Sequence, residues 1–272
     1  LPLVAMGVRG GPVNAQAPSS APLRMVIAFA PGGSADTIGR LIAEGLGPRL
    51  KRPVIPDNRP GATGTLGTGI VAKAEGDGNT ILMSTSSSHY SAYLYSSVSY
   101  KLEKDLTPVA GIAVVPLLVV ARPGLPVKDM ADLVALAKKS PGKLTYASPG
   151  SGGAAHLATE MFMRATGIQM LHVPYKGVAA GVIDVMGERV DVMFDSVSTS
   201  GPHVRAGKLR ALGISSSSRA AAMPEVPTIS ESVPGFEATY WMGIFAPATT
   251  PENTVKRLNT EINTVMASEF IK

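Results

Sequence analysis

Short apolar runs alternate with longer amphipathic segments along most of the chain. The short runs are bounded by turn residues, as buried strands are, whereas the longer segments repeat apolar residues at helical spacing. The expected strands are Arg24–Phe29, Pro53–Asp57, Thr80–Ser84, Pro108–Ala121, Lys143–Ala147, Met170–Val173, Val190–Asp195 and Lys208–Ser215. The expected helices are Ala35–Leu50, Gly64–Glu75, Lys128–Lys139, Gly153–Ala165, Val178–Gly187 and Pro251–Ser268. This alternation with short connections predicts an α/β fold with mostly parallel sheets.

The apolar run from Val109 to Val120 is longer than an ordinary strand, and Pro116 interrupts it. It is either one strand that crosses from one lobe into another or two consecutive core strands. Tyr240–Ala246, just before the final helix, is a second candidate crossing. Two crossings would return the last helix to the first lobe. They predict one lobe of residues 18–118 plus 243–272 and another of residues 119–242.

A glycine-rich turn joins the first expected strand directly to a helix. Its residues are Pro31, Gly32, Gly33, Ser34, Ala35 and Asp36. The first N–H groups of a helix have no partner within the helix, and the helix dipole adds positive potential there, so such a turn favours anions. An ordinary strand–turn–helix connection is the alternative, and Asp36 has a structural role in it, near the helix N-terminus.

A second small-residue turn follows the expected strand Lys143–Ala147 and precedes another helix. Its candidate ligand-binding residues are Ser148, Gly150, Ser151, Gly152 and Gly153, with His156 close behind. Two such turns more than a hundred residues apart suggest two similar lobes whose helix starts face one cleft. A carboxylate would fit between them.

Four further polar residues are candidates for the same cleft. Asp195 ends a strand, and ligands bind at the carboxyl ends of strands in open α/β sheets. Tyr175 follows another strand, and Ser86 and His89 belong to a run of small polar residues after a third. Each has an ordinary structural alternative as a loop cap, a rigid turn or a solvated loop.

Composition narrows the function classes. The formal net charge is +5, but the basic residues are scattered without aromatic interleaving, which does not favour a nucleic-acid partner. Ala15-Gln16-Ala17 fits a signal-peptidase site, so residues 1–17 are expected to be the remnant of a cleaved signal peptide. Because the chain has no cysteine, we expect no lipid anchor and a protein that diffuses freely in the periplasm.

The sequence offers no catalytic constellation. The four histidines lack the spacing of metal ligands, and no nucleophile-elbow or phosphate-loop motif is present. Gly67–Ala72 has the form of a dinucleotide fingerprint but follows a loop where a strand is required. We therefore expect no catalytic residue, no metal and no cofactor.

An ordered set of short motifs runs through almost the whole chain. It comprises Pro31–Asp36, Val54–Gly64 with Asn58–Ala62 inside it, Asp77–Thr80, Lys104–Val109, Ser148–Leu157, Val173–Gly177, Arg219 with Pro224–Thr228, and Gly243–Pro247. Each motif is weak alone. Together, and in this order, they resemble the periplasmic substrate-binding proteins of tripartite tricarboxylate transporters, often called Bug receptors.

That resemblance implies a two-lobed type II periplasmic-binding-protein fold. Each lobe would be a mostly parallel sheet flanked by helices, and two crossover strands would join them. The implied ligand is a dicarboxylate, tricarboxylate, acidic amino acid or aromatic acid, with one carboxylate between the turns Gly32–Ser34 and Ser148–Gly153 and with Tyr175 and Asp195 near its other end. His89 would lie in a loop that reads this distal end.

The implied partners are one large and one small membrane permease subunit, and the receptor itself is expected to be a monomer. Two other functions stay open. The loaded protein could dock on a membrane sensor kinase, or the same fold could carry an enzyme, since a fold does not fix a function.

Overall fold

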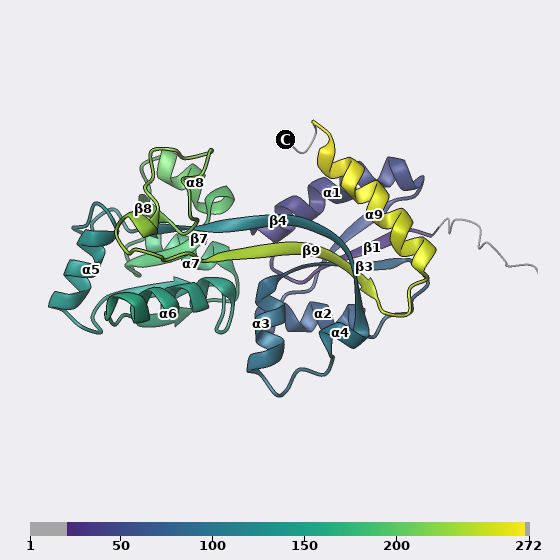
Figure 1. Cartoon of the computed structure of the whole chain (residues 1–272), viewed down its shortest axis with the longest axis horizontal. Helices are drawn as coiled ribbons and strands as arrows, with labels where there is room; N and C mark the ends of the chain where they lie inside the picture. The colour runs from purple at the N-terminus through teal and green to yellow at the C-terminus, as the bar shows by residue number, and fades with distance from the viewer. Residues whose placement is uncertain (1–20, 270–272) are drawn as a thin grey trace, which may run out of the picture.

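Two long strands, β4 (Leu106–Ala121) and β9 (Thr239–Pro247), run antiparallel to each other between two lobes of the chain (Figure 1). The computed structural model describes residues 21–269. The expected signal-peptide remnant, residues 1–17, lies outside the described residues. Within residues 21–269, no helix combines the length and the apolar character that crossing a membrane requires.

The first lobe is built on three parallel strands, β1 (Leu23–Ile27), β2 (Val54–Asn58) and β3 (Thr80–Thr85). Its sheet order is β2-β1-β3-β9-β4. The helices and 3-10 turn of this lobe are α1 (Ser34–Leu50), η1 (Ala62–Gly64), α2 (Thr65–Ala72), α3 (Ser86–Leu94), α4 (Leu102–Asp105) and α9 (Glu252–Ala267). Alternate residues of β1 serve two cores, because successive strand side chains point to opposite faces.

The second lobe repeats this plan with parallel strands β5 (Thr145–Ser148), β6 (Leu171–Pro174) and β7 (Val192–Ser196). The end of β4 pairs antiparallel with both β7 and β8 (Arg210–Ile214). The helices and 3-10 turn of the second lobe are α5 (Met130–Lys139), α6 (Ala154–Thr166), α7 (Val178–Met186), α8 (Val197–Arg205) and η2 (Ile229–Glu231). The parallel strands thus form the centre of each lobe, and the antiparallel pairs all involve β4 or β9.

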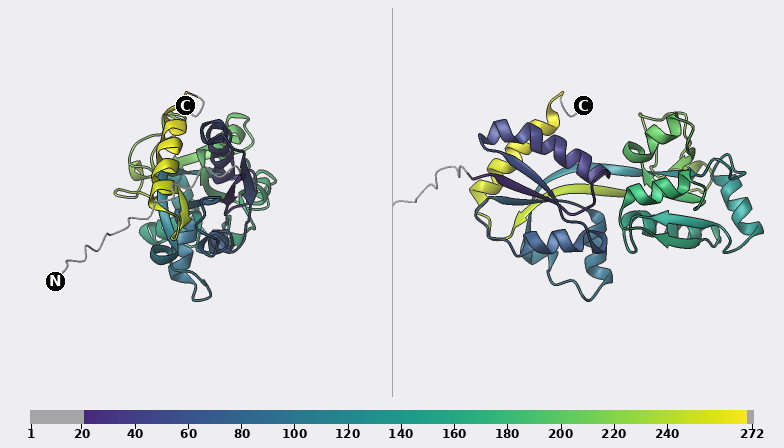
Figure 2. Two further views of the ribbon diagram at one scale, coloured as in Figure 1. Left: turned by 90° about the vertical axis from the view of Figure 1, so that its right-hand side faces the viewer. Right: turned by 180° about the vertical axis from the view of Figure 1, so that it is seen from behind.

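The apolar run around Pro116 is one continuous strand, so the interpretation as two consecutive core strands is wrong. The pairing of β4 with β9 runs from Leu106 opposite Pro247 to Pro116 opposite Thr239, with irregular register on both sides of Ala110. Beyond Pro116 the strand continues into the sheet of the second lobe. Seen from behind, the same two strands link the lobes (Figure 2). The expected lobe boundaries at 118/119 and 242/243 fall inside these strands and stay a prediction.

Three α-helices within residues 21–269, the short α4 as well as α3 and α8, do not correspond to any helix expected from the sequence. The polar run Ser86–His89 was interpreted as a loop, but it begins α3, and the hydroxyl of Thr85 accepts a capping hydrogen bond from the N–H of Ser87 at 3.2 Å. The N-terminus of α8 is capped in the same way by Ser196. Serine-rich segments and an internal proline, Pro202, have low helix propensity, and tertiary packing overrides it here.

Candidate functional site

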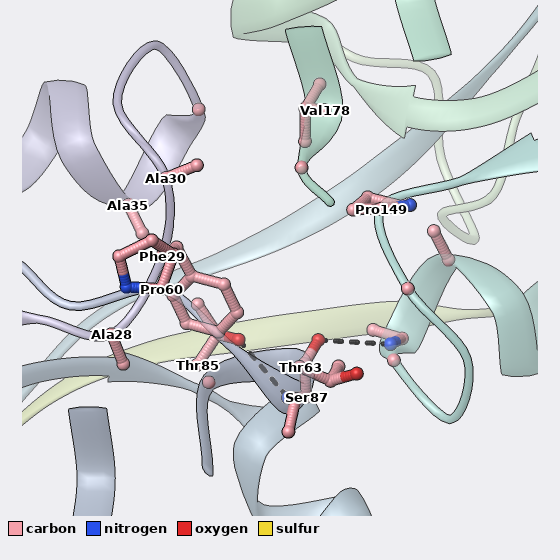
Figure 3. A pocket seen from close by; sticks show the side chains of 18 of the residues that line it. Ala28, Phe29, Ala30, Ala35, Pro60, Thr63, Thr85, Ser87, Pro149 and Val178 are labelled. Carbon is pink, nitrogen blue, oxygen red and sulfur yellow. Dashed lines mark hydrogen bonds between the residues drawn. The ribbon is translucent and has the colours of Figure 1, made fainter. Parts of the chain in front are cut away.

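A cleft of about 690 Å³ opens between the two lobes. Phe29 and Pro60 of the first lobe face Pro149 and Val178 of the second across it (Figure 3). The first residues of α1 and α6 line it as well, and Tyr240 of β9 reaches it from the strand that joins the lobes. The volume falls within the range of pockets that hold small organic ligands.

The start of α1 has no side-chain cap, and its turn is fixed from behind by Asp36. Gly33 takes the capping position with extended backbone, while the N–H of Gly32 donates to the Asp36 carboxylate at 3.0 Å. The same carboxylate accepts from Arg40 and Asn58, each at 2.9 Å. Asp36 is only 5% exposed, so it holds the turn and does not face the cleft.

The start of α6 is built in the same way. Gly153 caps it with extended backbone and no side-chain bond, and the N–H of Gly152 donates to Nδ1 of His156 at 3.1 Å. Gly32 and Gly152 both have positive φ, +85° and +77°, a conformation that glycine adopts without strain. In both lobes, therefore, the residue four positions after the glycine holds the turn, but one is a carboxylate and the other an imidazole.

The imidazole belongs to a stacked histidine pair behind the second turn. The rings of His156 and His172 lie 4.2 Å apart, and Nε2 of His172 is 2.6 Å from the hydroxyl of Ser148. Burial lowers the pKa of both histidines. Because Nδ1 of His156 accepts a hydrogen bond, the neutral ring carries its proton on Nε2, which lies 3.7 Å from Glu160.

Asp195 is a buried carboxyl at the carboxyl end of β7, where it lines the cleft. It is 4% exposed and accepts a hydrogen bond from the hydroxyl of Ser200 at 2.6 Å. Burial raises its pKa to about 6. No lysine, arginine or histidine among residues 21–269 forms an ion pair with it. An unpaired buried carboxyl in a cleft is typical of a functional site.

Two tyrosines complete this side of the cleft. Burial raises the pKa of Tyr240 to about 12, and its hydroxyl lies 2.7 Å from that of Ser34. Burial and the hydrogen bond to Asp184, 2.6 Å long, raise the pKa of Tyr175 to about 12. The Tyr175 hydroxyl is therefore already hydrogen-bonded to α7, and the aromatic ring is the part of Tyr175 that is left to contact a ligand.

The structure brings half of the expected ligand-binding residues into the lining of the cleft. They are Gly33, Ser34, Ala35, Gly150, Ser151, Gly153, Tyr175 and Asp195. It leaves outside the lining Pro31, Gly32, Asp36, Ser86, His89, Ser148, Gly152 and His156. Asp36 and His156 are turned back onto their own glycines, and Ser148 is turned toward His172.

His89 needs a correction because it lies in α3 and not in a loop. Its ring packs edge-on against Trp241, with centroids 4.5 Å apart, and against Phe245 at 5.1 Å. Ser86 is fully buried beside it. This geometry therefore does not support the expectation that His89 contacts the distal end of the ligand.

Several residues of the cleft were missed by the sequence analysis, notably Thr63, Ser87 and Tyr240. Thr63 lies inside the Val54–Gly64 motif, and Tyr240 lies in the second expected crossing. Neither the motif nor the apolar run shows which side chains reach the other lobe, because that depends on how the lobes pack. Within residues 21–269, no group of three or more acidic or histidine side chains is arranged to hold a metal ion.

Comparisons with known proteins agree with this architecture. The family described as "Tripartite tricarboxylate transporter family receptor" matches residues 38–271. Protein BugT of Bordetella pertussis is 37% identical over 263 residues, which cover 96% of this chain and 81% of BugT.

Two solved structures with ligands in their names are similar over the same extent. "R. palustris Rpa4515 with adipate" is 35% identical, with a TM-score of 0.89, and covers 92% of this chain and 84% of that one. "MatC (Rpa3494) from Rhodopseudomonas palustris with bound malate" is 31% identical, with a TM-score of 0.86, and covers 92% and 85%. The two-lobed fold expected from the motifs is confirmed.

Proposed function

Because this chain belongs to the tripartite tricarboxylate transporter family receptors, we propose that it is a periplasmic solute-binding protein that captures a small organic carboxylate between its lobes. One observation carries the proposal. Two helix starts, those of α1 and α6, line a single cleft, and the N-cap residue of each is a glycine that provides no side-chain cap. Backbone N–H groups at such positions bind carboxylates, and the dipoles of both helices add to the attraction.

In the proposed complex one carboxylate bridges the turns at Gly33–Ala35 and Gly150–Gly153. The body of the ligand extends toward Tyr175 and Asp195, whose carboxyl accepts a hydrogen bond from a ligand hydroxyl, amine or water. A ligand that contacts both lobes favours the closed state, because only that state satisfies both sets of donors. Binding alone is proposed, with no chemical step and no cofactor.

The same site and the names of the relatives support a proposal for the ligand class. Adipate and malate appear in the names of two similar structures, and both are small dicarboxylates. We propose a ligand of that kind, with tricarboxylates, acidic amino acids and aromatic acids as the other members of the class. The loaded receptor, exported through a cleaved signal peptide and monomeric, delivers it to a permease of one large and one small membrane subunit.

A thermal-shift screen of organic acids tests the proposal. The panel contains adipate, malate, citrate, glutamate and benzoate, and adipamide serves as an uncharged control of matched length. A ligand at 100 times its dissociation constant adds about 2.7 kcal/mol to the free energy of unfolding. At least one acid should raise the melting temperature while the amide does not. A wider carboxylate panel without any shift, on protein shown by mass spectrometry to carry no ligand, would refute the proposal.

A further inference from the structure

The loop that precedes α2 has an unusual backbone. Four consecutive residues have positive φ: Gly61 (+145°), Ala62 (+44°), Thr63 (+55°) and Gly64 (+89°). Glycine accepts such angles freely, but a β-branched residue such as Thr63 does not. A strained residue of this kind persists only where its surroundings hold it in place, and such residues cluster at ligand clamps and switch regions.

The side chain of Thr63 reaches across to the second lobe. Its hydroxyl donates a hydrogen bond to the carbonyl oxygen of Ser151 at 2.9 Å. Its hydroxyl oxygen lies 3.1 Å from the position that a Cβ on Gly150 would occupy, and its methyl carbon lies 2.9 Å from that of a Cβ on Gly153. The close approach thus depends on glycine at both positions of the second turn.

Ser87 makes the complementary contact next to it. Its hydroxyl oxygen accepts a hydrogen bond from the N–H of Ala154, the first residue of α6, at 3.0 Å (Figure 3). It also lies 3.7 Å from the Cβ position of Gly153. Two hydroxyl groups of the first lobe therefore hold one carbonyl and one N–H of the turn that starts α6.

The loop is tied down from within its own lobe by other contacts. The N–H of Gly64 donates to the carbonyl of Gly61 at 3.0 Å, and the hydroxyl of Thr65 donates to the carbonyl of Ala62 at 2.9 Å. Thr63 has no share in these bonds. Its side chain is thus directed outward, toward Ser151.

We propose that Thr63 is a positioning residue: its left-handed backbone aims the hydroxyl at Ser151 and fixes the start of α6 against the first lobe. Ser87 supports the same contact from α3. The inference deepens the proposed function, on which its ligand measurement rests. The distance between the lobes tests it without any ligand.

The first experiment measures that distance by electron–electron resonance. The chain has no cysteine, so spin labels can be placed on Glu44→Cys in α1 and Ala135→Cys in α5, both exposed. Thr63→Val keeps the branched shape and removes the donor, and we expect the closed-to-open ratio to fall about fivefold. Thr63→Ser keeps the donor and should retain the native distribution.

Two further variants separate the hydrogen bond from the backbone strain. Thr63→Gly loses the hydroxyl but accepts the positive φ. Its lobes should therefore open as those of Thr63→Val do, while its melting temperature should be higher than that of Thr63→Val. Thr260→Val is the matched control, because it removes a threonine hydroxyl bonded to the carbonyl of Lys256 within α9. Native distance distributions in both Thr63→Val and Thr63→Gly would overturn the inference.

The second experiment measures adipate binding by titration calorimetry. Thr63→Val should weaken binding about fivefold, while Thr63→Ser should stay within about twofold of the native protein. Equal affinity in all three proteins would also overturn the inference. If adipate does not bind the native protein, that result counts against the proposed ligand, and the distance measurement still decides the role of Thr63.

Discussion

Single residues set the charge behind each helix start. Asp36 holds the first turn and is paired with Arg40 four residues later, at 2.9 Å. His156 holds the second turn and has Glu160 four residues later, at 3.7 Å. In both lobes the residue four positions after the glycine accepts a hydrogen bond from its N–H, but the side chain that follows is a cation in the first lobe and an anion in the second. The carboxylate behind α1 offsets part of the helix dipole, whereas the neutral imidazole behind α6 leaves it intact.

Exchange of the acceptor behind α6 tests this difference. His156→Asp would place a carboxylate near Glu160, without the arginine that Asp36 has, and we expect carboxylate affinity to fall at least about tenfold. His156→Asn keeps a neutral acceptor for the N–H of Gly152 and should stay within about threefold. Calorimetry with the acid that gives the largest thermal shift measures both. Undiminished affinity of His156→Asp would show that the ligand anion does not lie at the start of α6.

Asp195 makes stability depend on pH in a defined direction. Its pKa is about 6 in the folded protein, above the ordinary value of 3.8, because the carboxyl is buried. The folded state therefore holds its proton more tightly, and this contribution is complete below pH 3.8 and lost as the pH rises through 6. The histidines act in the opposite sense, since their pKa values are lowered and their contribution is lost as the pH falls below about 6.5.

Asp195→Asn isolates the carboxyl from the histidines. The amide stays neutral, so the variant should gain up to about 3 kcal/mol over the native protein at pH 8 and lose that advantage near pH 4. Urea unfolding at several pH values gives the difference, and the histidine contribution cancels because both proteins share it. A difference that does not change between pH 4 and pH 8 would mean that the carboxyl titrates normally in the folded protein.

At the scale of elements, α9 returns to the first lobe and packs beside α1. A Cβ on Gly45 of α1 would come within 2.8 Å of Val265 of α9, so the two helices approach closely. Ile262 of α9 is fully buried in the same core and has no part in the lining of the cleft. This helix stabilises the lobe without touching the ligand site.

Ile262→Ala should therefore separate stability from binding. The lost methylene groups and the cavity they leave lower the free energy of unfolding by about 2–4 kcal/mol. At a temperature where the variant is folded, its carboxylate affinity should equal that of the native protein. Denaturant titration and calorimetry provide the two values. A loss of affinity in the folded variant would mean that α9 influences lobe closure.

The elements also show what sequence patterns can predict. The strand that crosses at Pro116 and the helix starts after Gly33 and Gly153 follow from apolar runs and turn residues. The helices α3 and α8 did not, because their serine-rich first turns are stabilised by caps and by burial, which a local pattern does not report. Half of the expected site residues line the cleft, and two that do not, Asp36 and His156, are engaged in hydrogen bonds that only the folded turn reveals.

At the scale of the whole molecule, the cleft exists because two similar lobes are connected by the two strands β4 and β9 and leave a space between them. Within residues 21–269, side-chain hydrogen bonds across it join Thr63 to Ser151 and Ser87 to Ala154, besides the bond of Ser34 to Tyr240 on the connecting strand β9. Packing adds to them, since a Cβ on Gly152 would come within 3.2 Å of Leu94 and Tyr95. No pattern in the sequence identifies these partners, since they are far apart along the chain. A molecule joined in this way can open and close as two rigid bodies, and small side chains at the mouth are what permit closure.

A bulky residue at the mouth should therefore hold the lobes apart. Ser34 lines the cleft at the first helix start, so Ser34→Trp would fill the space where the lobes meet and block binding while the fold stays intact. Small-angle scattering should show the native protein becoming more compact when a binding acid is added and the variant not responding. Ser217→Trp, on an exposed loop, is the matched control and should respond like the native protein. Normal compaction and unchanged affinity in Ser34→Trp would remove the first turn from the ligand site.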